Sequence, residues 1–183
     1  MPEEERDARA QGLVERFAMG QTVNVYATMA RHPDVIERCI PLGQQLRSGR
    51  LSLRERELLI LRTGWRCSCD YEYAQHSRLA LGGGMTIEDL HRILDGPEAP
   101  GWEPHEAALL RAADELHDHA CIGADTWAAL ATRYDAEQLI EVPMVVGYYH
   151  LIAFFLNSLG VPLEAGAQGF PARSDSDDPT RSA

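Results

Sequence analysis

Three residues near Tyr71 have side chains that can carry out proton or thiol chemistry, and their spacing is that of one face of a helix. Cys69, Glu72 and His76 lie three and four positions apart, and residues at this spacing share one face of an α-helix. Glu72 and His76 suit general acid/base catalysis, because burial raises the pKa of a carboxyl group toward neutrality and a neighbouring imidazolium lowers it again. The spacing alone leaves open an exposed i,i+4 pair on a helix surface.

A fourth candidate, Glu57, belongs to the segment LRERELLILRTGW, where it falls on the same apolar stripe as Ile60 and Leu61. A carboxylate on an apolar face is costly unless it has a partner. If this segment and the next one form a helical hairpin, the polar positions of both meet in an otherwise apolar groove. Glu57 is then expected beside Glu72 and His76.

The cysteines of the Cys67-Ser68-Cys69 segment allow more than one interpretation. Near a helix start, the helix dipole can lower the pKa of the Cys69 thiol and make it a nucleophile, but free cysteine is also a common buried packing residue. Cys67 could act as the resolving cysteine and form a disulfide with Cys69, although the short ring that this disulfide closes would be strained. Together with Glu72 and His76 the two cysteines match no common zinc framework, so no metal ion is expected.

Residues flanking these segments are candidates for substrate binding. An arginine can hold a substrate carboxylate through a bidentate fork, aromatic rings can line an apolar pocket, and a histidine in an apolar segment can face a pocket, a subunit contact or a hydrogen-bonded core. The candidates are Arg62, with Arg78 as a further arginine, Trp65, Tyr71, Tyr73 and His150. A separate run, His117 to Cys121, is better explained by cationic residues at a helix C-terminus than by a metal site.

Helical patterns that would position these residues extend along the whole chain, without sustained strand-like alternation. We predict an all-α, single-domain helical bundle over residues 11–170, between a flexible N-terminus (1–10) and a disordered C-terminal tail (171–183). Capping boxes, glycines and prolines mark the ends of the helices. The predicted helices cover Gln11 to Ala30, about 33 to Arg47, about Leu53 to Arg66, Cys69 or Asp70 to Leu81, about Thr86 to Leu94, Glu103 to Ala120, Asp125 to Tyr134 and Asp135 to Leu159.

The composition narrows the class of protein. The 183 residues suit one domain, and the formal net charge of −11 without a basic cluster argues against nucleic acid as a partner. The charged N-terminus does not resemble a secretory signal, so we expect a cytoplasmic protein with four reduced cysteines. The apolar segment from Val142 to Leu163 contains Pro143, His150 and Asn157, which favour a buried helix over a membrane span.

The stretch RERELLILRTGWRCSCDYEYAQHSRLALGGGMTIEDL resembles the core of the carboxymuconolactone decarboxylase and alkylhydroperoxidase D-like superfamily. In that superfamily an acidic residue on one helix precedes a CxxC pair or a YEW-x-x-H-like segment, read here from Tyr71 to His76. The resemblance assigns the catalytic positions to Glu57, Cys69 and His76, and it places Glu72 where the alkylhydroperoxidase branch has its second cysteine. A carboxylate cannot resolve a disulfide.

The resemblance implies a decarboxylase-like enzyme that needs no metal or organic cofactor and acts on a small carboxylated molecule. In this reaction Glu72 and His76 would exchange a proton and Glu57 would orient His76. A thiol antioxidant using Cys69 with Cys67 is the first alternative, and a non-catalytic assembly or small-molecule binding protein is the second.

Assembly into a homo-oligomer is expected on two grounds. The segment VPMVVGYYHLIAFFLNSLGVPL has more apolar surface than one side of a helix can bury, so Tyr148, Leu151 and Phe155 are expected to pack against another subunit. The resemblance implies a trimer or hexamer, or a dimer, with pockets near the subunit contacts.

Overall fold

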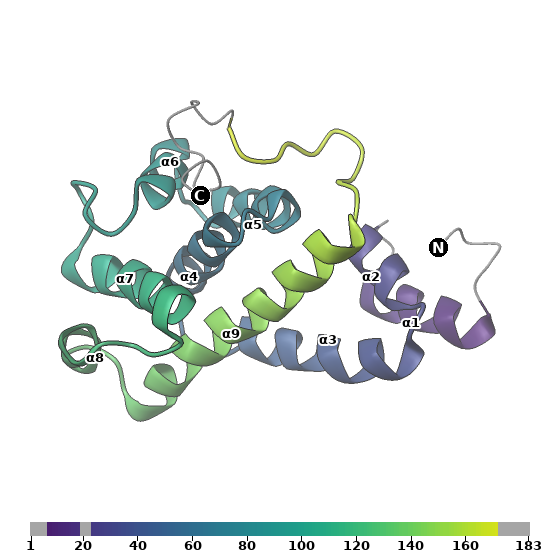
Figure 1. Cartoon of the computed structure of the whole chain (residues 1–183), viewed down its shortest axis with the longest axis horizontal. Coiled ribbons are helices and arrows are strands. Elements are labelled where there is room, and N and C mark those ends of the chain that lie inside the picture. Colours follow the sequence, from purple (N-terminus) through teal and green to yellow (C-terminus); the bar gives the residue numbers. More distant parts are fainter. Residues whose placement is uncertain (1–6, 19–22, 172–183) are drawn as a thin grey trace.

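The computed structural model describes residues 7–18 and 23–171. These residues form nine α-helices and no strand (Figure 1), which confirms the predicted all-α class. The helices are α1 (Ala8–Ala18), α2 (Asn24–Met29), α3 (Pro33–Arg47), α4 (Leu53–Arg66), α5 (Asp70–Gly82), α6 (Ile87–Asp95), α7 (Pro104–His119), α8 (Ala124–Ala131) and α9 (Ala136–Leu159).

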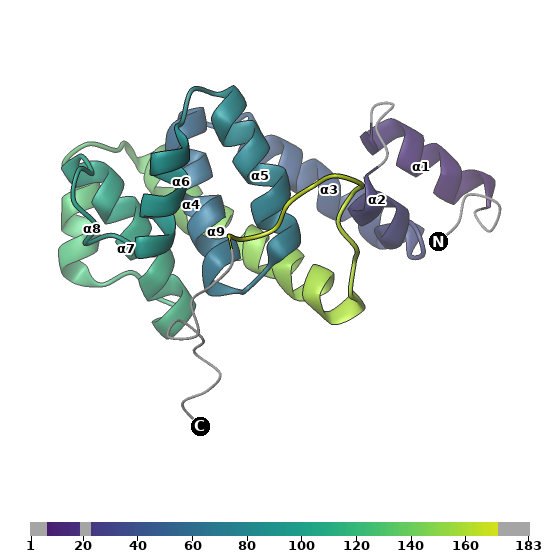
Figure 2. The ribbon, with the colours of Figure 1, turned by 90° about the horizontal axis from the view of Figure 1, so that it is seen from above.

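Helix α4 lies at the centre of the bundle. It begins at the predicted capping box, in which Ser52 and Glu55 satisfy each other's backbone N–H groups. Every residue from Glu55 to Gly64 is buried, because α5, α6, α7 and α9 all pack around this helix (Figures 1 and 2). Polar side chains on α4 must therefore form hydrogen bonds or ion pairs with other groups inside the protein.

A short turn folds α5 back against α4, as predicted for a helical hairpin. Ser68 in this turn adopts a left-handed conformation with φ 50°, which non-glycine residues seldom adopt. Gly64 allows the close approach, since a Cβ added there would lie 3.3 Å from the Cβ of Glu72. Cys69 caps the N-terminus of α5 and so lies just before the helix that carries Glu72 and His76.

The N-terminal part differs from the single helix predicted from Gln11 to Ala30. Helix α1 begins earlier, at Ala8, and a separate helix α2 begins at Asn24; residues 19–22 lie outside the described part. Contacts with distant segments fix the new start, because the backbone N–H of Asn24 donates to Glu164 at 2.9 Å and that of Val25 donates to the Tyr71 hydroxyl at 3.1 Å. Propensity along one segment could not reveal these contacts.

The structure describes only parts of the two terminal segments that were predicted to be flexible or disordered. The first three helical residues of α1, from Ala8 to Ala10, fall within the N-terminus predicted to be flexible, whereas residues 1–6 lie outside the described part. Pro171 is the one described residue of the predicted tail, and the rest of it lies outside as well. Helix α8 ends at Ala131, earlier than predicted, and Tyr134 follows it in a short turn.

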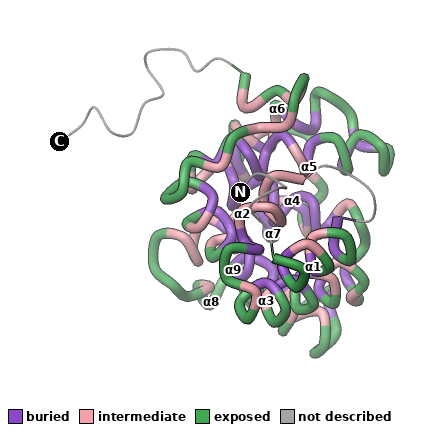
Figure 3. The backbone as a smooth tube through the Cα atoms, turned by 90° about the vertical axis from the view of Figure 1, so that its right-hand side faces the viewer, coloured by how far each residue is buried: buried purple, intermediate pink, exposed green. Residues whose placement is uncertain are grey.

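Helix α9 crosses the bundle and contacts α3, α4, α5 and α7. Within the described residues it alone is long and apolar enough to span a membrane, and 44% of its most apolar window is buried. Its inner face is buried in the core and its outer face is exposed, with Ile140, Leu151 and Phe154 at least half exposed (Figure 3). The packing favours the interpretation of α9 as a core helix.

Candidate functional site

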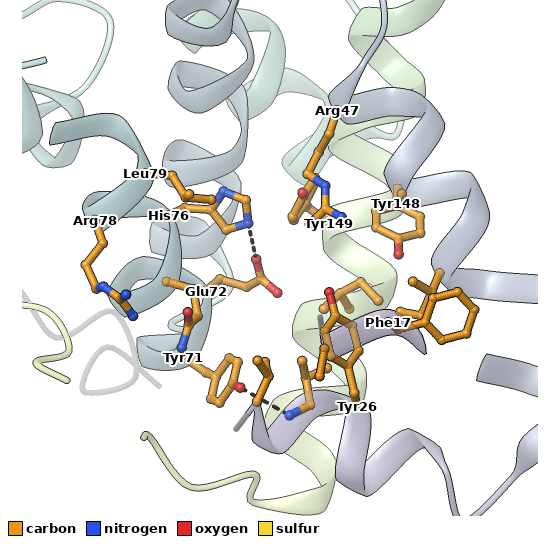
Figure 4. Close-up of a pocket in the computed structure, with 17 residues that line it drawn as sticks. Phe17, Tyr26, Arg47, Tyr71, Glu72, His76, Arg78, Leu79, Tyr148 and Tyr149 are labelled. Atoms are coloured by element: carbon orange, nitrogen blue, oxygen red, sulfur yellow. Dashed lines mark hydrogen bonds and ion pairs between the residues drawn. The ribbon is translucent and has the colours of Figure 1, made fainter. Parts of the chain in front are cut away.

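Glu57, Glu72 and His76 converge between α4 and α5. Nδ1 of His76 lies 2.7 Å from a carboxyl oxygen of Glu57, and Nε2 lies 3.5 Å from Oε2 of Glu72. All three side chains are buried, Glu57 at 1% exposure. Glu57 thus fixes one nitrogen of the imidazole ring and leaves the other turned toward Glu72 (Figure 4).

The electrostatics of this group favour proton exchange near neutral pH. Burial is the main cause that raises the pKa of Glu72 to about 7, and the negative charge of Glu57 adds to it. Burial alone would lower the pKa of His76, but the charge and hydrogen bond of Glu57 raise it above its ordinary value. Oε2 of Glu72 is buried and makes no hydrogen bond among the described residues, although it lies 3.5 Å from Nε2 of His76.

Glu72 and His76 form part of the wall of a cavity of about 550 Å³. The cavity lies between α5, α3, α9 and the N-terminal helices, and its wall is mostly apolar and aromatic (Figure 4). Its lining residues are Phe17, Ala18, Val23, Val25, Tyr26, Ile40, Gly43, Arg47, Tyr71, Glu72, Gln75, His76, Arg78, Leu79, Tyr148, Tyr149 and Ile152. A volume of this size suits a small organic molecule.

Arg47 brings a positive charge to this cavity from the last turn of α3. Its guanidinium points into the cavity on the side of Tyr149, across from Glu72 (Figure 4). It is close enough to act electrostatically on both Glu72 and His76. A cation among tyrosines and aliphatic side chains is suited to bind a carboxylate.

The structure places Cys69 apart from the cavity wall. Its side chain is fully buried, and burial raises the pKa of the thiol to about 12, although backbone hydrogen bonds from the start of α5 act in the opposite direction. The expectation that the helix start lowers this pKa is therefore wrong, because desolvation outweighs the helix terminus. Cys67 and Cys69 are both free thiols.

Of the predicted substrate-binding residues, Tyr71 and the further arginine Arg78 are among those that line the cavity. The hydroxyl of Tyr71 donates to Glu164, which also accepts from Gln75, so this tyrosine helps to fix the wall. Arg62 is instead directed into the core, where it pairs with Asp114 at 2.7 Å and donates to two backbone carbonyls at the end of α6. Four of the five N–H donors of this guanidinium are thus engaged inside the protein, which argues against a role in substrate binding.

Trp65, Tyr73 and His150 also lie outside the cavity lining. The rings of Trp65 and Tyr73 pack against Phe170, with centroids 5.0 and 4.6 Å away, so the C-terminal segment covers them. Nε2 of His150 faces Nδ1 of His117 at 2.9 Å. Tyr148, predicted at a subunit contact, faces the cavity and packs beside Gly43.

The cavity wall opposite α5 was not predicted from the sequence. Arg47, Tyr26, Tyr148 and Tyr149 come from three helices distant from α5 in the sequence. One signal was present, because Tyr148 and Tyr149 are polar-tipped aromatics in an otherwise apolar helix, and buried tyrosines usually have a partner for the hydroxyl group. Arg47 carries no such signal, since a basic residue at a helix C-terminus is ordinary.

Comparisons with known proteins found one family match and several structures of the same fold. Residues 33–115 match the model of the carboxymuconolactone decarboxylase family, and this segment includes Glu57, Glu72 and His76. A comparison with curated proteins found no match.

Solved structures share the fold at low identity. A peroxidase-related protein from Ralstonia eutropha with an alkylhydroperoxidase AhpD core has a TM-score of 0.77 at 18% identity, over 90% of each chain. A putative antioxidant defence protein AhpD from Agrobacterium tumefaciens has a TM-score of 0.71 at 16% identity, over 75% of this chain and 96% of that one.

The debrominase Bmp8 is a third similar structure, with a TM-score of 0.75 at 14% identity over 90% of each chain, and a variant of it was solved with 2,3,4-tribromopyrrole. Residues 33–115 thus match the carboxymuconolactone decarboxylase family, and the chain shares its helical fold with the alkylhydroperoxidase D-like structures.

Proposed function

We propose that the protein is an enzyme that uses Glu72 and His76 for acid/base chemistry on a small carboxylated organic molecule. The observation that carries the proposal is the buried carboxyl group of Glu72 in the residues that line the cavity, where Oε2 makes no hydrogen bond and lies 3.5 Å from Nε2 of His76. A general acid or base works best when its pKa is close to the operating pH, and burial brings the pKa of Glu72 to about 7.

Glu57 acts in this proposal as a positioning residue for His76. Its carboxylate accepts a hydrogen bond from Nδ1–H at 2.7 Å, which sets the ring orientation and stabilises the imidazolium. His76 can then exchange a proton with Glu72 through Nε2. Glu57 is absent from the cavity lining, so it acts through His76 rather than on the substrate.

Arg47 supplies the recognition of a carboxylate. A substrate carboxylate bound to its guanidinium would lie in the same cavity as Glu72, with tyrosine rings on either side. In a decarboxylation, the bond between carbon and the carboxylate breaks, CO₂ leaves, and the electron pair left on carbon takes a proton from Glu72. Proton transfer next to a carbonyl group, without loss of CO₂, would use the same groups.

The thiol route has less physical support in this chain. A thiolate nucleophile needs a lowered pKa and access to the substrate, and Cys69 is fully buried with a raised pKa. Glu72, at the position that the superfamily resemblance gives to the resolving cysteine, cannot form a disulfide. One similar structure is named as an antioxidant defence protein and another as peroxidase-related, and these names therefore do not decide the reaction here.

The test compares Glu72→Gln and His76→Ala with wild type, using a carboxylated γ-lactone as the probe. Release of CO₂ and incorporation of solvent deuterium into the probe separate decarboxylation from proton transfer. Loss of general acid/base catalysis lowers kcat by about 10²- to 10⁴-fold. The melting temperature and helical circular dichroism should change little, and turnover by Glu72→Gln at the wild-type rate would contradict the proposal.

Hydroperoxide turnover forms the second arm of the test. With a dithiol reductant and cumene hydroperoxide, we expect weak or no turnover, and Cys69→Ser should retain the acid/base activity. Robust peroxidase activity that Cys69→Ser abolishes would instead favour the antioxidant function, and a further requirement for Cys67 would identify the two cysteines as the redox centre.

Assembly as a homo-oligomer stays part of the proposal. The outer face of α9 presents an exposed apolar stripe, which consists of Ile140, Met144, Leu151 and Phe154. The spacing of these residues follows successive helical turns, so they form one continuous face. Burial of this face between subunits would remove it from water.

A further inference from the structure

Three side chains with metal-binding atoms meet where the ends of α4 and α7 contact the middle of α9. They are Cys67 at the C-terminal cap of α4, His117 in the last turn of α7, and His150 in α9. Their Sγ and ring nitrogen atoms all lie within 4.8 Å of one another, and each residue is half-buried. None of the three lines the cavity that contains Glu72 and His76.

The spacing of the ligand atoms is close to that of a tetrahedral metal site. Sγ of Cys67 lies 4.0 Å from Nδ1 of His117, and this nitrogen lies 2.9 Å from Nε2 of His150. A tetrahedral zinc ion with ordinary bond lengths would separate sulfur from nitrogen by about 3.5 Å and the two nitrogens by about 3.3 Å. Small side-chain rotations would therefore bring all three atoms into position.

The hydrogen bonding of His150 prepares its ring to act as a ligand. Nδ1 lies 2.9 Å from the backbone carbonyl of Val146, and a carbonyl oxygen can only accept, so Nδ1 must carry the proton. In the neutral ring this leaves the lone pair on Nε2, which points toward His117 and Cys67. Metal-bound histidines generally have their second nitrogen held by such a contact.

Other contacts hold the three helices together at this point. Nδ2 of Asn157 in α9 donates to the carbonyl oxygen of Cys67 at 2.8 Å. Arg66 pairs with Asp118 at 2.5 Å and lies 3.7 Å from Asp114, which fixes the end of α7 beside the end of α4. None of these contacts uses a ligand atom, so the site would be preorganised.

We propose that Cys67, His117 and His150 form a binding site for a divalent transition-metal ion, with Zn²⁺ the best fit to the donor set. One thiolate and two imidazoles suit a borderline-soft cation, and three protein ligands leave a fourth position for water. Binding replaces the proton on the Cys67 sulfur, which is released to solvent. The proton that Nδ1 of His117 shares with Nε2 of His150 moves to Nε2 of His117, so that Nδ1 can bind the ion. The ion would fasten α4, α7 and α9 together directly before the turn that leads into α5.

The sequence does not reveal this site, because its ligands are spread from residue 67 to residue 150 and belong to three separate helices. The neighbouring His119 and Cys121 are closer to a sequence motif, but both are exposed and neither belongs to the cluster. They therefore provide matched controls of the same residue types in the same region.

The experiment uses untagged full-length protein stripped of metal with EDTA. Titration with Zn²⁺ against a chromophoric chelator should give one ion per chain, and Co²⁺ should give a tetrahedral spectrum with a thiolate charge-transfer band. Cys67→Ser should abolish that band. Because even outer partners of a metal site contribute about 10- to 100-fold in affinity, Cys67→Ser and His117→Ala should weaken Zn²⁺ binding by at least that range.

Control variants and a spectroscopic measurement on wild type make the outcome decisive. His119→Ala, Cys121→Ser and Glu72→Gln should bind Zn²⁺ as wild type does, which separates this site from the proposed acid/base site. X-ray absorption of zinc-loaded wild type should show one sulfur at about 2.3 Å and two imidazoles at about 2.0 Å. Absence of stoichiometric binding, a zinc shell without sulfur, or binding lost only in the control variants would overturn the proposal.

Discussion

Replacement of Glu57 by Gln tests whether this residue maintains the charge of His76. Glutamine has nearly the same shape and can still accept a hydrogen bond from Nδ1, which lies 2.7 Å from Glu57 in the wild type. The change therefore removes the negative charge but keeps the geometry. We expect the pKa of His76 to fall, because burial then acts without the opposing charge of Glu57.

The size of this fall follows from the hydrogen bond that changes. A hydrogen bond to a charged group contributes about 1.5–3 kcal/mol, and one between neutral groups contributes about 1 kcal/mol. The preference of the folded state for the imidazolium should thus decrease by about 0.5–2 kcal/mol, which corresponds to a fall of roughly 0.4–1.5 pKa units.

The pH dependence of stability should change as well. In the wild type the pKa of His76 is raised above 6.5, so its contribution to stability is complete below that pH and is lost as the pH rises through the folded-state pKa. In Glu57→Gln the folded-state pKa is lower, so the contribution should be smaller and should be lost at lower pH than in the wild type.

The assay is an NMR titration of the histidine ring signals between pH 5 and 9. The protein has seven histidines, and the signal of His76 is the one absent from His76→Ala. Urea unfolding at several pH values measures the linked change in stability. An unchanged or raised pKa of His76 in Glu57→Gln would refute the role given to Glu57.

Three further changes probe the cavity and the outer face of α9. Arg47→Met should raise KM for a carboxylated probe by roughly 10- to 100-fold, since a charged hydrogen bond is lost, with little change in melting temperature; an unchanged KM would remove Arg47 from substrate binding. Gly43→Ala would place a Cβ 2.5 Å from Cζ of Tyr148, so the ring must shift toward the cavity. This change should cost about 1–3 kcal/mol and raise KM, and wild-type values of both melting temperature and KM would contradict it. Phe154→Glu puts a charge on the exposed stripe and should dissociate the oligomer in sedimentation equilibrium at micromolar concentration, whereas a wild-type protein that is already a 20.3 kDa monomer would exclude the interface.

The group formed by Glu57, Glu72 and His76 was largely predictable, because the sequence features that indicate it lie close together in the chain. Glu72 and His76 lie one helical turn apart, and the capping box at Ser52 fixes the register of the helix that carries Glu57. A buried carboxylate must then find a partner on the adjacent helix, and the 2.7 Å contact between Glu57 and His76 satisfies this requirement.

The cavity and its cation depended on distant packing and could not be predicted in the same way. Arg47, Tyr148 and Tyr149 face Glu72 only because α3 and α9 meet beside α5, and no periodic pattern specifies that meeting. Arg62 had the more suggestive position in the sequence, but Asp114, 52 residues later, binds it in the core. Cys69 shows a related limit, because the effect of a helix start on a thiol depends on how deeply the thiol is buried.

The most direct test of the central claim is the pKa of Glu72 itself, measured without any substrate. Carboxyl carbons of glutamate, labelled with ¹³C, can be followed by NMR from pH 3 to 9 in wild type and in Glu72→Gln. We predict one signal that titrates near pH 7, as burial requires, and that is missing from the variant. If every glutamate in the wild type titrates in the ordinary range near pH 4, Glu72 is not the proton donor and acceptor proposed here.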